Sequence, residues 1–406
     1  MPILIWQTRD EDIQVAKRVP CRRLEEVQEL SAGDPNTGNM LIQGDNLEAL
    51  KALLPLYAGR VKCIYIDPPY NTRSVYKHYN DNVENSMWLS MMWPRLELLR
   101  DLLAEDGSMW VNIDDHQVHY LKVILDEIFR RSRFVANVVW QRRRSRENRK
   151  AIGCGHDHIL VYAQAGAQRW KKYRNLFQDH GKGYANPDND PNGPWRSTHF
   201  SAQGFRANQM YKIITPTGDE LYPPKGRCWG ATEAKFVHLR DVEKRVYFTK
   251  NGRGRPIIKK YKFEESGLAP MTWWTADEFG DNQQAKKEII KLFNNEYVFD
   301  TPKPEKLIER ILHIATNPGD LVLDSFLGSG TTAAVAHKMG RRYIGIEIGE
   351  HVVTHCAPRL KKVIDGEQGG VSKALGWKGG GGYRFYRLGQ AVCDEGRPCT
   401  RPLDEN

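Results

Sequence analysis

Residues 61–72 read VKCIYIDPPYNT, an apolar run with a chemically distinctive ending. The run at 61–66 predicts a strand inside a parallel sheet, where helices cover both faces of each strand. It stops at Asp67, and the two prolines that follow cannot continue a strand ladder. A second apolar run, LVL at 321–323, is followed by DSFLGSGTT at 324–332. Because open α/β folds bind ligands at the carboxyl ends of their strands, the two endings are predicted to form one site.

Strands and helices alternate around both runs, which predicts an α/β fold with a parallel sheet covered by helices on both faces. Apolar residues recur at helical spacing over 84–104, and the turn at Asp106 and Gly107 leads into a further strand. The predicted strands are the run that begins at Met40, 61–66, 108–113, 134–140, 321–323 and 343–347, and the predicted helices are 47–54, 84–104, 116–130, 305–315 and 331–339.

The composition changes between about residues 164 and 295, where Gly, Pro, Asn, Trp and basic residues replace helical periodicity. The α/β pattern resumes afterwards, so this segment is predicted to be a module inserted into the first fold. Alternation over 383–388 predicts a closing strand before a polar tail. The predicted organisation is a lead-in at 1–40, a discontinuous α/β domain at 41–164 and 296–365, an inserted module at 165–295, and a C-terminal strand and tail at 366–406.

The chain of 406 residues carries 60 Lys and Arg against 50 Asp and Glu, a net charge of +10. This balance favours a polyanionic partner, although solubility alone would also account for it. No run approaches the roughly 18 apolar residues of a membrane span, and the first residues lack the plan of a signal peptide, so we expect a cytoplasmic protein without membrane contact. Seven cysteines without Cys-x-x-Cys pairs indicate neither a disulfide framework nor a thiolate zinc site.

Two clusters contain residue types that bind metals: CGHDH at 154–158, and His351 with His355 and Cys356. The first leads into an apolar run at 159–163, which predicts a strand, and neighbouring residues of a strand point to opposite faces. A catalytic zinc ion normally takes three protein ligands, and no clear third ligand is visible. We therefore predict no metal site.

The glycine loop after the second strand admits three interpretations. Gly328-x-Gly330-x-x-Ala333 has the spacing of a dinucleotide fingerprint, and Glu347 ends the next strand, where a ribose hydroxyl would bind. In that fingerprint the first glycine follows its strand almost directly, whereas Asp324 and three further residues intervene here. A phosphate loop would need a lysine after Gly330, and none is present. The loop best suits S-adenosylmethionine, with Asp324 facing its amino group and Glu347 its ribose.

The Asp-Pro-Pro-Tyr motif at 67–70 indicates a function more specifically than the glycine loop does. Its prolines hold Asp67 and the Pro68 carbonyl at the sheet edge as acceptors without competing NH groups. The exocyclic amine of a nucleobase is a poor nucleophile because its lone pair is delocalised, and two acceptors on its hydrogens favour attack on a sulfonium methyl group. Tyr70 would stack on a flipped-out base. The alternative is a turn that only ends a strand, and the glycine loop downstream argues against it.

Together these motifs resemble the β-class amino-methyltransferases of DNA, and most of all the modification subunits of type III restriction systems. The resemblance rests on GDNL at 44–47, DPPYNT at 67–72, TPKP at 301–304, the glycine loop and IGIE at 344–347. It implies a Rossmann-like S-adenosylmethionine-dependent methyltransferase sheet with permuted motif order and an inserted target recognition domain. The implied catalytic residues are Asp67, Pro68, Pro69 and Tyr70, and the implied cofactor-binding residues are Asp45, Thr301, Lys303, Asp324, Phe326, Gly328, Gly330, Thr331 and Glu347.

Asp at position 67 is typical of adenine N6 modification in this family, whereas Ser there would favour cytosine N4. The resemblance thus implies site-specific methyl transfer to the N6 amino group of adenine in DNA, by base flipping. Cytosine N4 methylation, an RNA substrate and an inactive DNA-binding subunit are the alternatives. The implied partners are double-stranded DNA, a second copy of the chain and a restriction subunit, and the implied origin is bacterial or phage.

Basic residues gather in two places suited to DNA phosphates. One group follows the strand that ends at Trp140, on the catalytic side of the sheet, and the other lies in the inserted module. The alternative for such a run is a solvated loop without a partner. The predicted DNA contacts are Arg142, Arg143, Arg144, Arg146, Lys250, Arg253, Arg255 and Lys259.

Overall fold

The computed structural model divides the chain into two compact units, residues 1–175 with 270–406, and residues 176–269. The second unit is narrower than the module predicted at 165–295. Residues 270–295 belong to the first unit because Trp273 and Trp274 add a short strand to its sheet. The structure describes residues 2–72, 74–75, 80–81, 84–146, 151–178, 183–264, 267–294 and 299–391, so the predicted tail beyond Ala391 lies outside the described residues.

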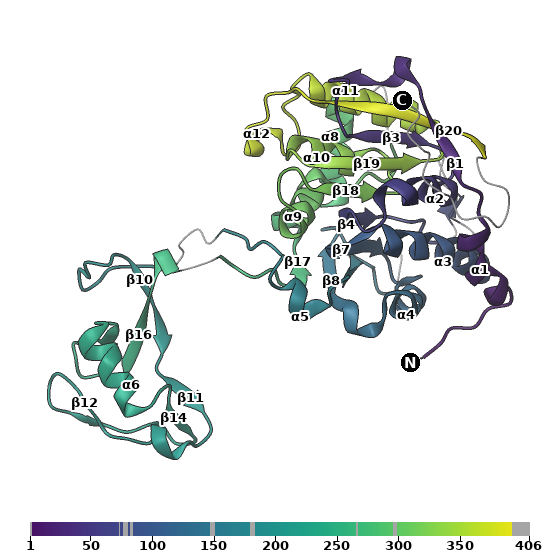
Figure 1. Cartoon of the computed structure of the whole chain (residues 1–406). Coiled ribbons are helices and arrows are strands. Elements are labelled where there is room, and N and C mark those ends of the chain that lie inside the picture. The colour runs from purple at the N-terminus through teal and green to yellow at the C-terminus, as the bar shows by residue number, and fades with distance from the viewer. Residues whose placement is uncertain are drawn as a thin grey trace, which may run out of the picture. The chain divides into compact units, whose positions relative to one another are not determined.

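An eleven-stranded sheet forms the centre of the first unit (Figure 1). Neighbouring strands are parallel from β20 to β7, as predicted. In spatial order the strands are β1 (Arg22–Glu26), β20 (Gly382–Ala391), β3 (Met40–Gln43), β19 (Arg342–Glu347), β18 (Leu321–Asp324), β4 (Val61–Ile66), β7 (Leu103–Ile113), β9 (His156–Ala163), β8 (Phe134–Gln141) and β17 (Trp273–Trp274), and β2 (Ala32–Gly33) also pairs with β20.

The sheet departs from the prediction at β9, which runs antiparallel to both β7 and β8. Among the described residues between β8 and β9, 142–146 and 151–155, there is no crossover helix such as a parallel pair needs, and the two strands pair antiparallel. The lead-in and the C-terminal strand are also part of the sheet, because β1 pairs with β20 and β20 pairs with β3. They therefore do not form the separate segments that the sequence predicted.

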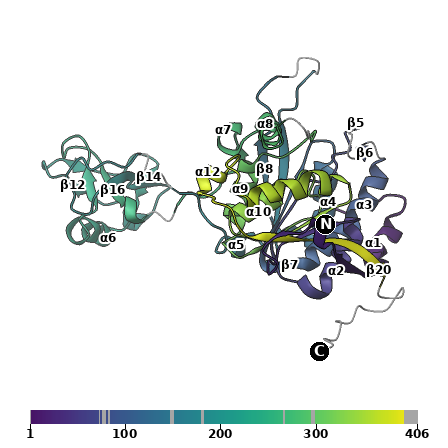
Figure 2. The same cartoon turned by 90° about the horizontal axis from the view of Figure 1, so that it is seen from above.

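Helices cover both faces of the sheet (Figures 1 and 2). The connection from β3 to β4 through α2 and the connection from β18 to β19 through α10 cross the sheet in opposite directions. Right-handed crossovers therefore place α2 and α10 on opposite faces. The helices of this unit are α1 (Arg9–Arg18), α2 (Asn46–Tyr57), α3 (Asn85–Leu102), α4 (Val118–Phe129), α5 (Ala167–Trp170), α7 (Ala276–Phe279), α8 (Asn282–Leu292), α9 (Glu305–Ala315), α10 (Thr331–Lys338), α11 (Ala357–Ile364) and α12 (Ser372–Leu375).

The core lies on the central strands that the apolar runs predicted. Ile64 and Ile66 of β4, Leu323 of β18 and Ile346 of β19 have no exposed surface. Burial of such side chains contributes roughly 1.5 to 3 kcal/mol each. The strands that carry the chemical motifs therefore lie within the buried centre of the sheet. No helix in the described part of the chain is long and apolar enough to cross a membrane.

The second unit is small and rich in β structure. Its core joins Phe200, Ile213, Trp229, Phe236 and Phe248. The strands β10 (Trp195–His199), β16 (Pro256–Tyr261) and β15 (Val246–Phe248) form an antiparallel sheet, β11 (Ser201–Gln203) pairs with β14 (Arg227–Trp229), β12 (Ile213–Ile214) pairs with β13 (Glu220–Leu221), and α6 (Glu233–Val237) is the α-helix.

Candidate active site

A cavity of about 670 Å³ lies at the edge where β4, β7, β18 and β19 end. Small-molecule sites span roughly 300 to 1,000 Å³, so this volume suits a cofactor-sized ligand. The cavity brings together the two motifs that the sequence predicted to meet. The predicted residues in its wall are Asp45, Asp67, Pro68, Pro69, Tyr70, Thr301, Lys303, Asp324, Phe326, Gly328, Thr331 and Glu347, whereas Gly330 lies behind the wall as the N-cap of α10.

Asp67 follows β4, and both of its carboxylate oxygens accept hydrogen bonds. Oδ1 accepts from the Tyr70 hydroxyl at 2.9 Å, and Oδ2 accepts from Nζ of Lys303. Nζ of Lys303 also lies 5.3 Å from the centroid of the Tyr70 ring. The turn is held from α3 by Trp88, whose Nε1 donates to the Pro69 carbonyl at 2.7 Å. An amino group that uses Asp67 as its acceptor would therefore share this carboxylate with Tyr70 and Lys303.

A second acid, Asp157, lies beside this motif, although the sequence analysis did not select it. Because β9 is antiparallel, its first residues lie at the same sheet edge as the carboxyl ends of its neighbours, and His158 pairs with Ile113 of β7. Asp157 accepts from the Tyr70 hydroxyl at 3.2 Å and forms an ion pair with Arg142 at 2.8 Å. Burial raises the pKa of Asp157 to about 6, although Arg142 opposes the rise. Two acids with different surroundings thus flank one tyrosine.

The Tyr70 hydroxyl is held by three polar neighbours. It donates toward Asp67 and Asp157, and it accepts from the side-chain amide of Asn112, a fully buried residue of β7. Burial, followed by the charges of Asp157 and Asp67, raises the pKa of Tyr70 well above its ordinary value. The hydroxyl therefore stays protonated, and its hydrogen bonds fix the plane of the ring at the cavity wall.

Asp324 ends β18 and anchors the glycine loop. Its side chain is 2% exposed and accepts from Oγ1 of Thr332 at 2.6 Å and from the backbone NH of Phe326 at 3.0 Å. Burial raises its pKa to about 7, and these hydrogen bonds only partly oppose the rise. At the end of the loop Gly330 has a φ of +79°, and a Cβ there would lie 3.3 Å from the Cα of Cys356. The backbone therefore requires glycine at this position.

Glu347 ends β19 and remains a carboxylate. Its Oε2 accepts from the NH of Gly328 at 2.8 Å, and its Oε1 accepts from the NH of Ile348 at 2.9 Å. Burial raises the pKa of Glu347, but the His351 ring and the backbone NH groups of Gly328 and Gly349 outweigh burial and hold the pKa below its ordinary value. A negative charge is thus kept beside the glycine loop.

Asp45 and its neighbours complete the cavity on the β3 side. Asp45 caps α2 by accepting from the NH of Leu47 at 2.7 Å, and Nη2 of Arg95 lies 3.0 Å from each of its carboxylate oxygens. Asn46 donates to the carbonyl of Ser325 at 2.7 Å, which ties the loop after β3 to the loop after β18. Arg95 was not predicted because it lies in the middle of α3, outside any motif.

The basic residues after β8 are exposed from Arg143 to Arg146, but three of the four arginines of this segment also have specific places in the first unit. Arg142 and Arg143 line the cavity. Arg144 forms ion pairs with Asp277 at 2.6 Å and Asp281 at 2.7 Å, and so joins this segment to α7 and α8. The exposed Arg146 lies at the end of the described segment. A DNA contact by Arg142 or Arg144 would therefore compete with acids of the same unit.

The four basic residues predicted in the second unit are placed differently. Lys250, Arg253 and Arg255 are exposed in the turn between β15 and β16. Lys259 is 6% exposed and forms ion pairs with Asp188 and Asp190. The prediction that Lys259 contacts DNA is therefore wrong, because the alternation of β16 turns this side chain into the unit. A sequence of consecutive basic residues does not show which of them a strand buries.

The mostly parallel sheet, with acids at or just after the ends of β3, β4, β18 and β19 around one cavity, defines a Rossmann-like α/β protein with a ligand site at its strand ends and confirms the predicted fold class. The chain belongs to the DNA methylase family, whose model matches residues 61–357. This confirms the family resemblance that the motifs carry.

Two curated relatives are modification subunits. The probable type III restriction-modification enzyme HindVI Mod subunit of Haemophilus influenzae is 32% identical over 89% of this chain and 55% of its own length. The type III restriction-modification enzyme StyLTI Mod subunit of Salmonella typhimurium is 35% identical over 74% of this chain and 50% of its own length. The chain thus spans about half the length of these relatives. Among solved structures, the cytosine-N4-specific PvuII DNA methyltransferase covers 84% of this chain and 91% of its own, with a TM-score of 0.44 and 16% identity.

Proposed function

We propose that the protein transfers a methyl group from S-adenosylmethionine to the N6 amino group of adenine at specific sites in duplex DNA. The observation that carries this proposal is the meeting of two motifs at one cavity, namely Asp67 with its proline turn and the loop that begins at Asp324. Membership of the DNA methylase family supports the reaction class.

The side chains of the cavity fit S-adenosylmethionine. Asp324 would hold the ammonium group of its methionine part, Glu347 its ribose hydroxyls, and Asp45 would lie near its adenine. The positive φ values of Gly328 and Gly330, at +55° and +79°, allow the backbone to turn closely around a ligand. When bound, the cofactor supplies a methyl group on a sulfonium centre, which is the electrophile of the reaction.

Asp67 is the group that makes the target amine reactive. Its carboxylate, together with the Pro68 carbonyl, accepts hydrogens from the amino group, so that the nitrogen lone pair is directed at the methyl carbon. With the cofactor bound, Asp67 or water would take the surplus proton that the amino group releases as it gains the methyl group. Tyr70, held by Asn112 and Asp157, offers a fixed ring on which the flipped base stacks.

A methyl-transfer assay tests this function. Purified protein is incubated with duplex DNA and cofactor labelled on the methyl group, and the DNA is digested to nucleosides. We expect N6-methyladenine, and sequencing of modified bases in cells that express the chain would give the recognition site. If the product is N4-methylcytosine, the target base is cytosine and not adenine. If structured RNA is labelled in preference to duplex DNA, the substrate is RNA. If no labelled product forms, the proposed activity is wrong.

Cofactor affinity is predicted to fall as the pH drops below 7. Burial raises the pKa of Asp324 to about 7, and an ammonium group binds to its carboxylate form. Below that pKa the affinity should fall by up to about tenfold per pH unit, and above it the affinity should be flat. Calorimetric titrations from pH 8 downwards measure this slope. Asp324→Asn should bind the cofactor weakly at every pH, and its affinity should show no such dependence on pH. A pH dependence that remains in Asp324→Asn would show that Asp324 does not hold the ammonium group.

The exposed turn of the second unit is predicted to contact DNA phosphates. Joint replacement of Lys250, Arg253 and Arg255 by alanine should weaken duplex binding and flatten its salt dependence, by about 0.9 in the log–log slope for each phosphate that is no longer neutralised. Fluorescence anisotropy at several salt concentrations measures both. Lys235→Ala, which breaks a 2.7 Å ion pair with Glu243 in the same unit, is the control. Equal salt slopes for the triple variant and the wild type would contradict the prediction.

Duplex DNA is the partner that this function requires, in the cytoplasm of a bacterial or phage-infected cell. The names of the two curated relatives suggest a restriction subunit as a further partner, and a second copy of the chain is the other candidate. Light scattering of the purified chain, alone and with a restriction subunit encoded beside it, distinguishes the two assemblies.

A further inference from the structure

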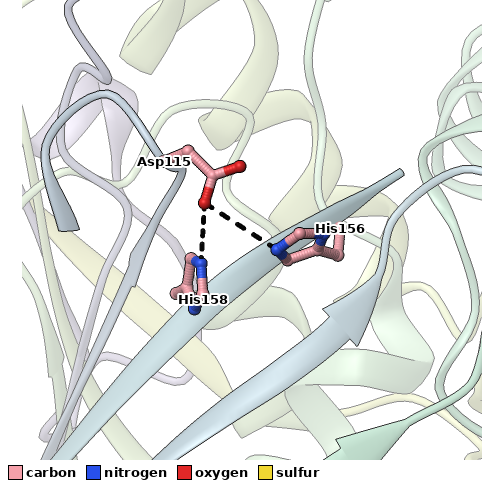
Figure 3. Close-up of side chains that lie close together, drawn as sticks. All are labelled: Asp115, His156 and His158. Atoms are coloured by element: carbon pink, nitrogen blue, oxygen red, sulfur yellow. Dashed lines mark hydrogen bonds and ion pairs between the residues drawn. The ribbon is translucent and has the colours of Figure 1, made fainter. Parts of the chain in front are cut away.

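Three side chains of metal-binding types converge outside the wall of the cavity (Figure 3). His156 and His158 lie two residues apart on β9 and share one face of the strand, and Asp157 between them points to the other face, into the cavity. Asp115 reaches them from the segment after β7. The structure therefore supplies the third ligand that the sequence analysis did not find.

The spacing of these atoms matches that of ligands around a metal ion. Oδ1 of Asp115 lies 3.0 Å from Nε2 of His158 and 3.8 Å from Nε2 of His156, and the three ligand atoms lie within 4.8 Å of one another. A tetrahedral ion with bonds of about 2.0 Å separates its ligand atoms by about 3.3 Å. Only small side-chain shifts are needed to admit an ion.

Two further side chains favour a metal over a simple hydrogen-bonded cluster. Nδ1 of His158 lies 3.2 Å from Oδ1 and 3.1 Å from Nδ2 of Asn137, and this contact with the side-chain amide holds the ring with Nε2 toward Asp115. Metal-binding histidines are usually oriented by such a second contact. Sγ of Cys154 lies 3.4 Å from Oδ2 of Asp115 and 3.3 Å from the His156 carbonyl, and it would turn from that carbonyl toward the two rings to take a fourth position.

We propose that Asp115, Cys154, His156 and His158 bind one Zn²⁺ ion. One thiolate, two imidazoles and one carboxylate form the closed tetrahedral set that zinc prefers. The ion would tie the segment after β7 to the start of β9. Asp114 and Asp157, the neighbours of these ligands in the chain, both line the cavity, so the ion would hold two walls of the active site in register.

Metal content tests the site without reference to activity. The full chain, prepared without a histidine tag, is stripped with a chelator, titrated with Zn²⁺ and analysed by mass spectrometry of the metal. We expect one zinc per chain, lost in His158→Ala and in Asp115→Asn. His119→Ala, which removes an exposed histidine of α4, should keep the zinc. Asn137→Ala should weaken binding by about tenfold to a hundredfold.

Cobalt substitution examines the wild-type protein directly, so that the outcome does not depend on the folding of any variant. Bound Co²⁺ should show the visible bands of tetrahedral coordination and a thiolate charge-transfer band, and Cys154→Ser should lose the second while keeping the metal. Wild-type protein that takes up neither zinc nor cobalt, or that binds zinc equally well as Asp115→Asn, overturns the proposal. A tetrahedral spectrum without the thiolate band overturns Cys154 as the fourth ligand.

Discussion

Asp67→Ala should reduce methyl transfer by at least about a hundredfold to a thousandfold, the scale on which loss of one preorganised hydrogen-bonding group slows an enzyme. The variant removes the carboxylate that directs the amine lone pair, and the neighbouring acid Asp157 forms an ion pair with Arg142 at 2.8 Å. Cofactor affinity should change less than turnover, since Asp67 follows β4 whereas the glycine loop follows β18. Single-turnover kinetics and calorimetry measure the two quantities separately.

The control for this variant is Asp106→Ala. Asp106, like Asp67, forms an ion pair with a lysine, in this case Lys62, but it lies near the start of β7, at the other edge of the sheet. Both variants therefore lose an acid that is paired with a lysine. Asp67 lines the cavity, whereas Asp106 is not among its lining residues. Near-normal turnover of Asp67→Ala would show that the mechanism proposed for this residue is wrong.

Gly330→Val should weaken cofactor binding by at least about tenfold, through the backbone of the glycine loop. A β-branched residue at a φ of +79° is strained by roughly 1 to 3 kcal/mol. In addition, its Cβ would meet Cα, Cβ and Sγ of Cys356 at 3.3 Å, and relief of that contact moves the loop toward the ligand. Calorimetry measures the affinity, and thermal unfolding measures the stability.

Gly340→Val separates the two effects. Gly340 has a φ of +69°, and a Cβ there would meet nothing within 4 Å among the described residues. The variant therefore carries the backbone strain without the collision. Both variants should unfold at lower temperature, but only Gly330→Val should lose affinity for the cofactor. Equal affinities in the two would show that the loop does not hold the cofactor.

The sequence predicted the parts of the site that follow buried parallel strands. Asp67 and Asp324 each end an apolar run, and parallel strands bring such ends to one edge whatever the order of the strands. Asp157 was missed because its place depends on β9 being antiparallel, which an apolar run does not reveal. Asp115 was missed for the same reason, since only the pairing of β7 with β9 brings it to His158.

The sequence also did not allow us to predict which single polar residues are buried or where the second unit begins and ends. Lys259 is a basic residue like its exposed neighbours in the sequence, so its residue type does not indicate burial. Its ion pairs with Asp188 and Asp190 join residues that are far apart in the chain. The boundary near residue 270 depends on β17, a strand of two residues. A strand this short shows no alternation of apolar and polar residues that could be recognised in the sequence. Both features are decided by long-range pairing, whereas the motifs are local.

The pairing of β4 with β18, where Ile64 lies beside Leu323, has a consequence for synthesis of the protein. The catalytic half of the site leaves the ribosome early, but the strand that covers its edge is made only after the whole second unit. Closure of such a long loop is entropically costly and slows folding. The edge of β4 is therefore exposed on the nascent chain. A chain that stops before β18 would carry Asp67 without the glycine loop beside it, so the two halves of the site could not meet.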